Sequence, residues 1–179
     1  MTKTLIVPGL GDSGPEHWQT WIEGRLPASE RVTQPDWGLP DLDAWAKRVA
    51  VAVDEARHPP IVVAHSFGCL ATVRSAAFSK QRIGGALLVA PADPEVFGYA
   101  DLLPQHPLPY PVTLVASRTD PWMRFERAAE WAARWNATLV DLGNAGHINV
   151  ESGHGVWPEG LGLLRALERA TRPALALVG

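Results

Sequence analysis

The most informative segment of the chain reads Ile61-Val62-Val63-Ala64-His65-Ser66-Phe67-Gly68-Cys69-Leu70. A β-branched apolar run stops at a serine, and small residues suited to a helix follow almost at once. A sharp strand-to-helix turn of this kind lifts a hydroxyl above the edge of a sheet, as a nucleophile elbow requires. The usual pattern is Gly-x-Ser-x-Gly, and Ala64 is a mild replacement because the first position needs only a small side chain. Ser66 is therefore a candidate nucleophile, although a serine that caps a helix would give a similar pattern.

The composition limits the classes of protein to which the chain can belong. Its 179 residues, 46% hydrophobic and 20% charged, suit one globular domain over residues 1–179. A net charge of −3 without a Lys/Arg cluster argues against a nucleic-acid partner. No apolar segment is long enough to span a bilayer and none resembles a signal peptide. We therefore expect no membrane partner. The single cysteine cannot form an internal disulfide, which fits a reducing cytoplasm, so we expect a cytoplasmic protein.

Short apolar runs alternate with amphipathic segments along the chain. This alternation is typical of an α/β fold, in which helices cover both faces of a mostly parallel sheet. We expect six strands, at Thr4–Val7, Arg31–Gln34, Ile61–Ala64, Ala86–Ala90, Val112–Ala116 and Thr138–Asp141. We expect helices at Asp41–Ala56, Phe67–Ser79 and Arg124–Trp135, and a last one beginning near Pro158. The proline-rich segment Pro91–Pro111 is too short for a lid domain, and the apolar tail Pro173–Gly179 has no assigned place.

An active serine needs a histidine as its base and a carboxylate to orient that histidine. Asp120 follows one predicted strand and His147 follows the next, so both should reach the carboxyl edge of the sheet, where such folds bind ligands. Taken singly, Asp120 could start a turn or cap a helix, and His147 could be a surface residue. Together, in the order serine, acid, histidine, they predict a triad. His154 is the main rival as base.

The other histidines and the cysteine have weaker functional readings. His65 should point to the opposite side of the strand end from the nucleophile and pack there, while His58 and His106 should be exposed. Cys69 should be a buried apolar residue. Neither the histidines nor the cysteine has the spacing of metal ligands, so we expect no metal and no cofactor.

Acyl transfer develops negative charge on an oxygen, and backbone N–H groups must already point at it. One donor should be Phe67, directly after the nucleophile. The second should come from the flexible loop Pro8-Gly9-Leu10-Gly11-Asp12-Ser13-Gly14, where we assign Leu10. A phosphate-binding loop is a weak alternative, because no Gly-Lys-Ser/Thr ending is present.

Several motifs together resemble a known family. They are Val7-Pro8-Gly9-Leu10-Gly11-Asp12-Ser13-Gly14-Pro15-Glu16-His17-Trp18, Gln34-Pro35-Asp36-Trp37, the serine motif, and Ala145-Gly146-His147-Ile148-Asn149-Val150-Glu151-Ser152-Gly153-His154-Gly155-Val156-Trp157-Pro158. The chain resembles the small serine hydrolases grouped with retinoblastoma-binding protein nine, in the α/β-hydrolase superfamily. This resemblance implies a compact α/β-hydrolase fold without a lid domain, esterase-like activity, and a triad of Ser66, Asp120 and His147. It does not imply the namesake's protein partner, because the only cysteine here lacks the Leu-x-Cys-x-Glu context.

We expect a serine hydrolase that cleaves a small ester, thioester or amide. An aromatic rim of His17, Trp18, Trp37 and Trp122 would bind the small-molecule acyl substrate, although ordinary packing could explain the same residues. Packing is the stronger reading for Trp131 and Trp135, and Asn149 and Ser152 should hold the histidine loop. A ligand- or protein-binding relative without catalysis, or a lyase or perhydrolase with the same triad, remains open. The sequence identifies no protein partner.

Overall fold

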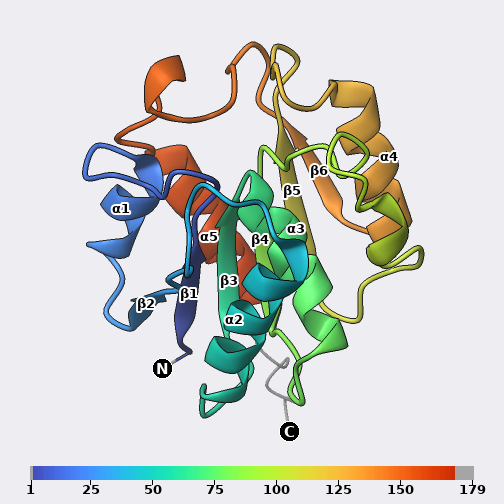
Figure 1. The fold of residues 1–179 in the computed structure, drawn as a ribbon. Helices are drawn as coiled ribbons and strands as arrows, with labels where there is room; N and C mark the ends of the chain where they lie inside the picture. The colour runs from blue at the N-terminus through green and yellow to red at the C-terminus, as the bar shows by residue number, and fades with distance from the viewer. Residues whose placement is uncertain (1, 172–179) are drawn as a thin grey trace, which may run out of the picture.

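Six strands form one parallel sheet in the computed structural model, which describes residues 2–171 (Figure 1). The strands are β1 (Thr4–Val7), β2 (Ser29–Arg31), β3 (Ile61–His65), β4 (Gly85–Val89), β5 (Val112–Ala116) and β6 (Thr138–Asp141). Their order is β2-β1-β3-β4-β5-β6, and every neighbouring pair is parallel. The predicted α/β fold with a six-stranded parallel sheet is confirmed. The tail Pro173–Gly179 lies outside the described residues.

Helices cover both faces of this sheet. They are α1 (Trp18–Glu23), α2 (Leu42–Asp54), α3 (Phe67–Arg74), α4 (Phe125–Trp135) and α5 (Pro158–Thr171). Three short 3₁₀ turns are η1 (Ser75–Ala77), η2 (Ala100–Leu102) and η3 (Val150–Ser152). In Figure 1, α2 and α3 lie in front of the strands and α5 lies behind them.

The strand residues alternate between two hydrophobic cores, as the two-residue period of a strand requires. In β3, Val62 and Ala64 pack with residues of α2, α3 and α4. Ile61 and Val63 face the other way and pack with residues of α1 and α5. His65 continues the second series, so its side chain starts on the α1 and α5 side of the sheet.

Some element bounds differ from those predicted. β2 covers Ser29–Arg31 rather than Arg31–Gln34, and directly after it the Val32 N–H still donates to the Ile6 carbonyl of β1 at 2.9 Å. β4 ends at Val89 because Ala90 takes a positive φ of 45°. α3 gives way to a 3₁₀ turn at Ser75, whose hydroxyl donates to the backbone carbonyl of Thr72 at 2.6 Å.

The strand order places the nucleophile motif beside the first loop. β1 lies between β2 and β3, so the chain reverses its direction of winding at the β1–β3 pair. Open α/β sheets bind ligands at such a reversal, outside the carboxyl ends of the strands. No helix within residues 2–171 combines the length and the apolar composition needed to cross a membrane.

Candidate active site

Ser66 forms a strained turn between β3 and α3. Its φ and ψ are 52° and −124°, a combination that few residues other than glycine adopt. The turn is enclosed by the loop after β1, because a Cβ added to Gly9 would lie 2.7 Å from the Ser66 Cβ. A Cβ on Gly68 would come within 2.3 Å of the Pro8 carbonyl oxygen. Glycine at both positions therefore lets the elbow and the β1 loop approach each other closely.

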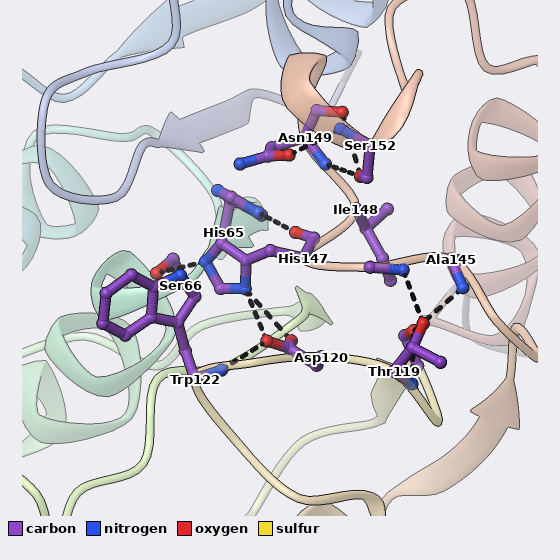
Figure 2. Close-up of polar contacts among 12 residues, drawn as sticks. His65, Ser66, Thr119, Asp120, Trp122, Ala145, His147, Ile148, Asn149 and Ser152 are labelled. Carbon is purple, nitrogen blue, oxygen red and sulfur yellow. Dashed lines mark hydrogen bonds and ion pairs between the residues drawn. The ribbon is translucent and has the colours of Figure 1, made fainter.

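The three residues predicted from the chain order meet at this turn. His147 Nε2 lies 2.9 Å from Ser66 Oγ, and His147 Nδ1 lies 3.0 Å from both carboxylate oxygens of Asp120 (Figure 2). The Asp120 carboxylate can only accept, so the imidazole proton belongs on Nδ1 and Nε2 is left free to accept from the serine hydroxyl. The Asp120 side chain is only 3% exposed. Its burial strengthens these contacts by excluding water.

The turn that carries Asp120 is tied to the loop that carries His147. Thr119 Oγ1 accepts the N–H of Gly146 at 3.1 Å, and Ser117 Oγ accepts the N–H of Ala145 at 3.0 Å. The Trp122 N–H donates to Asp120 at 2.9 Å, which fixes the carboxylate from its own turn. Acid and base are therefore positioned by one hydrogen-bonded unit that joins the ends of β5 and β6.

The backbone N–H groups of Phe67 and Leu10 are the predicted oxyanion donors. Phe67 is the first residue of α3, and the first four N–H groups of a helix have no partner within that helix. Leu10 lies in the tight turn where the Asp12 N–H donates to the Gly9 carbonyl at 3.2 Å. Neither Phe67 nor Leu10 donates any of the backbone hydrogen bonds that join turns and loops within residues 2–171. Their role as oxyanion donors stays a prediction.

A cleft of about 230 Å³ opens beside Ser66. Its walls come from the β1 loop, the end of β3 and the histidine loop, and its lining residues are Leu10, Asp12, Gly14, His17, His65, Ser66, His147, Asn149, Val150 and Glu151. Of the predicted rim residues, only His17 lines this cleft. Trp122 stands beside the triad, 63% exposed, with its ring centre 6.4 Å from that of His147.

The structure corrects the prediction for two tryptophans. Trp18 is fully buried among residues of α5 and β3, and its Nε1–H donates to the Ile148 carbonyl at 2.8 Å. It holds the histidine loop from beneath and cannot touch a substrate. Trp37 packs edge-on against Trp45, and its carbonyl accepts the Gly11 N–H at 2.9 Å. Its side chain packs against the core on the α2 and α3 face of the sheet and does not line the cleft.

The structure also places the other residues near the site whose roles were predicted from the sequence. His154 contacts Ser152 and Trp157 instead of the nucleophile, so it does not take the base's place. Asn149 and Ser152 bond reciprocally through side chain and backbone and close the histidine loop. Cys69 is buried and burial raises the pKa of its thiol, which argues against a thiolate nucleophile.

His17 and His65 pack next to the triad. The sequence did not predict that their rings and the ring of His147 contact one another. The His65 ring centre lies 4.9 Å from those of both His17 and His147. Burial, helped by the Arg31 guanidinium, lowers the pKa of His17 to about 4. Burial also lowers the pKa of His65 well below its usual range, with the neighbouring His147 adding to the effect. Both rings are therefore neutral at pH 7. Within residues 2–171, no group of three or more His, Cys, Asp or Glu side chains is arranged to hold a metal ion.

Comparison with known proteins agrees with this geometry. The family model described as serine hydrolase matches residues 4–166. The chain belongs to the serine hydrolase family. This serine hydrolase is 25% identical to the candidate hydrolase YdeN of Bacillus subtilis over 177 residues, covering 86% of this chain and 90% of that protein. The family resemblance predicted from the motifs is confirmed, and with it the general activity of a hydrolase.

Solved structures confirm the α/β-hydrolase fold. A YdeN-like protein from Pectobacterium atrosepticum superposes with a TM-score of 0.91 at 40% identity, covering 97% of this chain and 94% of that one. An esterase from Thermogutta terrifontis with propionate bound superposes with a TM-score of 0.72 at 14% identity, covering 99% and 86%. The second likeness concerns the fold alone.

Proposed function

We propose that this serine hydrolase is an esterase that works through an acyl-enzyme formed on Ser66. The carrying observation is the continuous hydrogen-bonded path from Ser66 Oγ through His147 to the Asp120 carboxylate, with contacts of 2.9 and 3.0 Å. An unactivated serine hydroxyl is a poor nucleophile, and a neighbouring base removes this limitation.

In the first half of the reaction, Ser66 Oγ attacks the carbonyl carbon of the ester while His147 Nε2 takes its proton. Asp120 orients the imidazole and stabilises the imidazolium. The N–H groups of Phe67 and Leu10 bind the oxyanion. The imidazolium then gives its proton to the leaving alcohol as the ester C–O bond breaks. In the second half, water attacks the acyl-enzyme with His147 as base, which releases the carboxylic acid and restores Ser66.

The dimensions of the cleft favour a small substrate. Pockets for drug-sized ligands usually measure about 300–1,000 Å³, and this cleft measures about 230 Å³. Its lining includes the apolar side chains of Leu10 and Val150, each about two-fifths exposed. We therefore propose short acyl esters as substrates, with His17 and the exposed Trp122 as the side chains that contact them.

The test combines covalent labelling with turnover. Wild type should react with a fluorophosphonate probe and hydrolyse p-nitrophenyl acetate and butyrate much faster than p-nitrophenyl palmitate. Ser66→Ala should abolish labelling, and Asp120→Asn should lower kcat by roughly 10⁴-fold because it leaves the wrong imidazole tautomer. A folded wild-type protein that neither labels nor turns over these esters would refute the proposal and favour a binding protein.

A further inference from the structure

Three imidazoles lie in a row across the base of the cleft. His17 caps the start of α1, His65 ends β3, and His147 comes from the loop before α5, with ring centres 4.9 Å apart at both steps. His65, the middle residue, is buried, with 5% of its surface exposed. His65 belongs to the strand that delivers the nucleophile and touches the loop that delivers the base. It therefore joins two parts of the candidate triad that are 81 residues apart in sequence.

The hydrogen-bond partners determine which nitrogen of each ring carries the proton. His17 Nδ1 accepts the Gln19 N–H at 3.1 Å, so the proton of the neutral ring is on Nε2. His65 Nε2 lies 3.0 Å from the backbone carbonyl oxygen of His147, which can only accept. The His65 proton is therefore also on Nε2, and this N–H donates to the backbone of the base (Figure 2).

This hydrogen bond is one of a pair on consecutive carbonyls. Trp18 Nε1–H donates to the Ile148 carbonyl at 2.8 Å, directly after the carbonyl that His65 binds. Ile148 itself has a positive φ of 47°, a strained conformation for a β-branched residue. The two ring N–H groups hold the backbone in this conformation from the α1 and α5 side, while hydroxyls from the Asp120 turn bind the loop's N–H groups from the other side.

We propose that His65 is a positioning residue for the base, and that its Nε2–H fixes the His147 main chain so that the imidazole meets Ser66 and Asp120 together. The proposal rests on the esterase function above. His65 touches no reacting atom in this scheme. It acts through the His147 carbonyl, so its contribution requires a hydrogen-bond donor and not merely a side chain that fills the space.

A matched pair of substitutions separates the donor from the packing. His65→Gln supplies an amide N–H near the former Nε2, whereas His65→Met has a side chain of similar length and shape without a donor. Both variants and wild type are assayed with p-nitrophenyl butyrate for kcat and KM, with circular dichroism to confirm folding. Should His65→Met fail to fold, His65→Phe takes its place, because it retains an aromatic ring between His17 and His147.

A loss of alignment in the base should appear in the chemical step. We expect the donor-free variant to lose about 10- to 100-fold in kcat, since a small misplacement of a reacting group can cost that much. We expect its KM to stay within about threefold, and the Gln variant to recover most of kcat. Equal kcat values for the Gln and donor-free variants, or a change confined to KM, would overturn the positioning role while leaving the esterase proposal intact. Inactive, unlabelled wild type would refute both.

Discussion

His17 should make the protein less stable as the pH falls from about 6.5 to 4. Burial and the nearby Arg31 lower the pKa of His17 from 6.5 to about 4 in the folded protein. Between these pH values His17 is protonated in the unfolded chain but stays neutral in the folded protein, so acidification favours unfolding. This stabilising contribution is fully present above pH 6.5 and is lost as the pH approaches 4.

The magnitude follows from the size of the pKa shift. Lowering the pKa from 6.5 to about 4 corresponds to roughly 3 kcal/mol when the whole shift is counted. Evaluated between pH 7 and 4.5, the His17 share of the unfolding free energy falls by roughly 2 kcal/mol. That is a large part of the stability of a typical domain, about 5–15 kcal/mol.

His17→Asn isolates this share. The Asn side-chain oxygen can accept the Gln19 N–H as His17 Nδ1 does, so the start of α1 keeps its cap while the titrating group is removed. Carboxylates and histidines that do not interact with His17 titrate alike in both proteins, so their contributions cancel in the difference. Urea unfolding followed by tryptophan fluorescence, at several pH values between 7 and 4.5 and constant ionic strength, gives both free energies. Wild type should lose roughly 2 kcal/mol more than the variant. Parallel stability curves, differing by a constant within about 0.5 kcal/mol, would refute the reasoning.

Two other predictions concern the elbow and the loop of the base. Gly68→Ala should destabilise by about 2–4 kcal/mol in urea unfolding, because its Cβ would lie 2.3 Å from the Pro8 carbonyl oxygen. Gly162 is exposed on α5 with open space around it, so Gly162→Ala should instead stabilise the protein by roughly 0.5–1 kcal/mol. Similar effects of the two substitutions would show that the clash with Pro8 does not determine the cost at position 68. Thr119→Val should lower kcat by about tenfold, because the Gly146 N–H loses its acceptor. Thr119→Ser keeps a hydroxyl and should stay near wild type; equal losses would rule out the hydrogen bond as the cause.

The sheet and the meeting of Ser66, Asp120 and His147 could be predicted because both depend on short-range patterns. Strands appear as β-branched runs, and parallel strands send their carboxyl ends to one edge, so residues just after successive strands must come close together. The sequence did not predict α1, because this helix has only six residues and its N-cap is His17, a residue type seldom found in that position. Its spacing nevertheless held a usable signal: Trp18 and Ile22 are four apart, as expected for one buried face of a helix.

The two-residue period of β3 predicts the face of the sheet on which His65 lies, but not the group that it contacts. The period correctly directs this side chain away from α3, to the side of Ile61 and Val63. It cannot say what lies there, because the partner is the carbonyl of His147, 82 residues further along the chain. The expected packing site is thus also the site where the main chain of the base is held. His65 therefore has two roles: it packs in the core on the α1 and α5 face, and it aligns His147 through a hydrogen bond. The comparison of Gln with Met at position 65 separates these two roles.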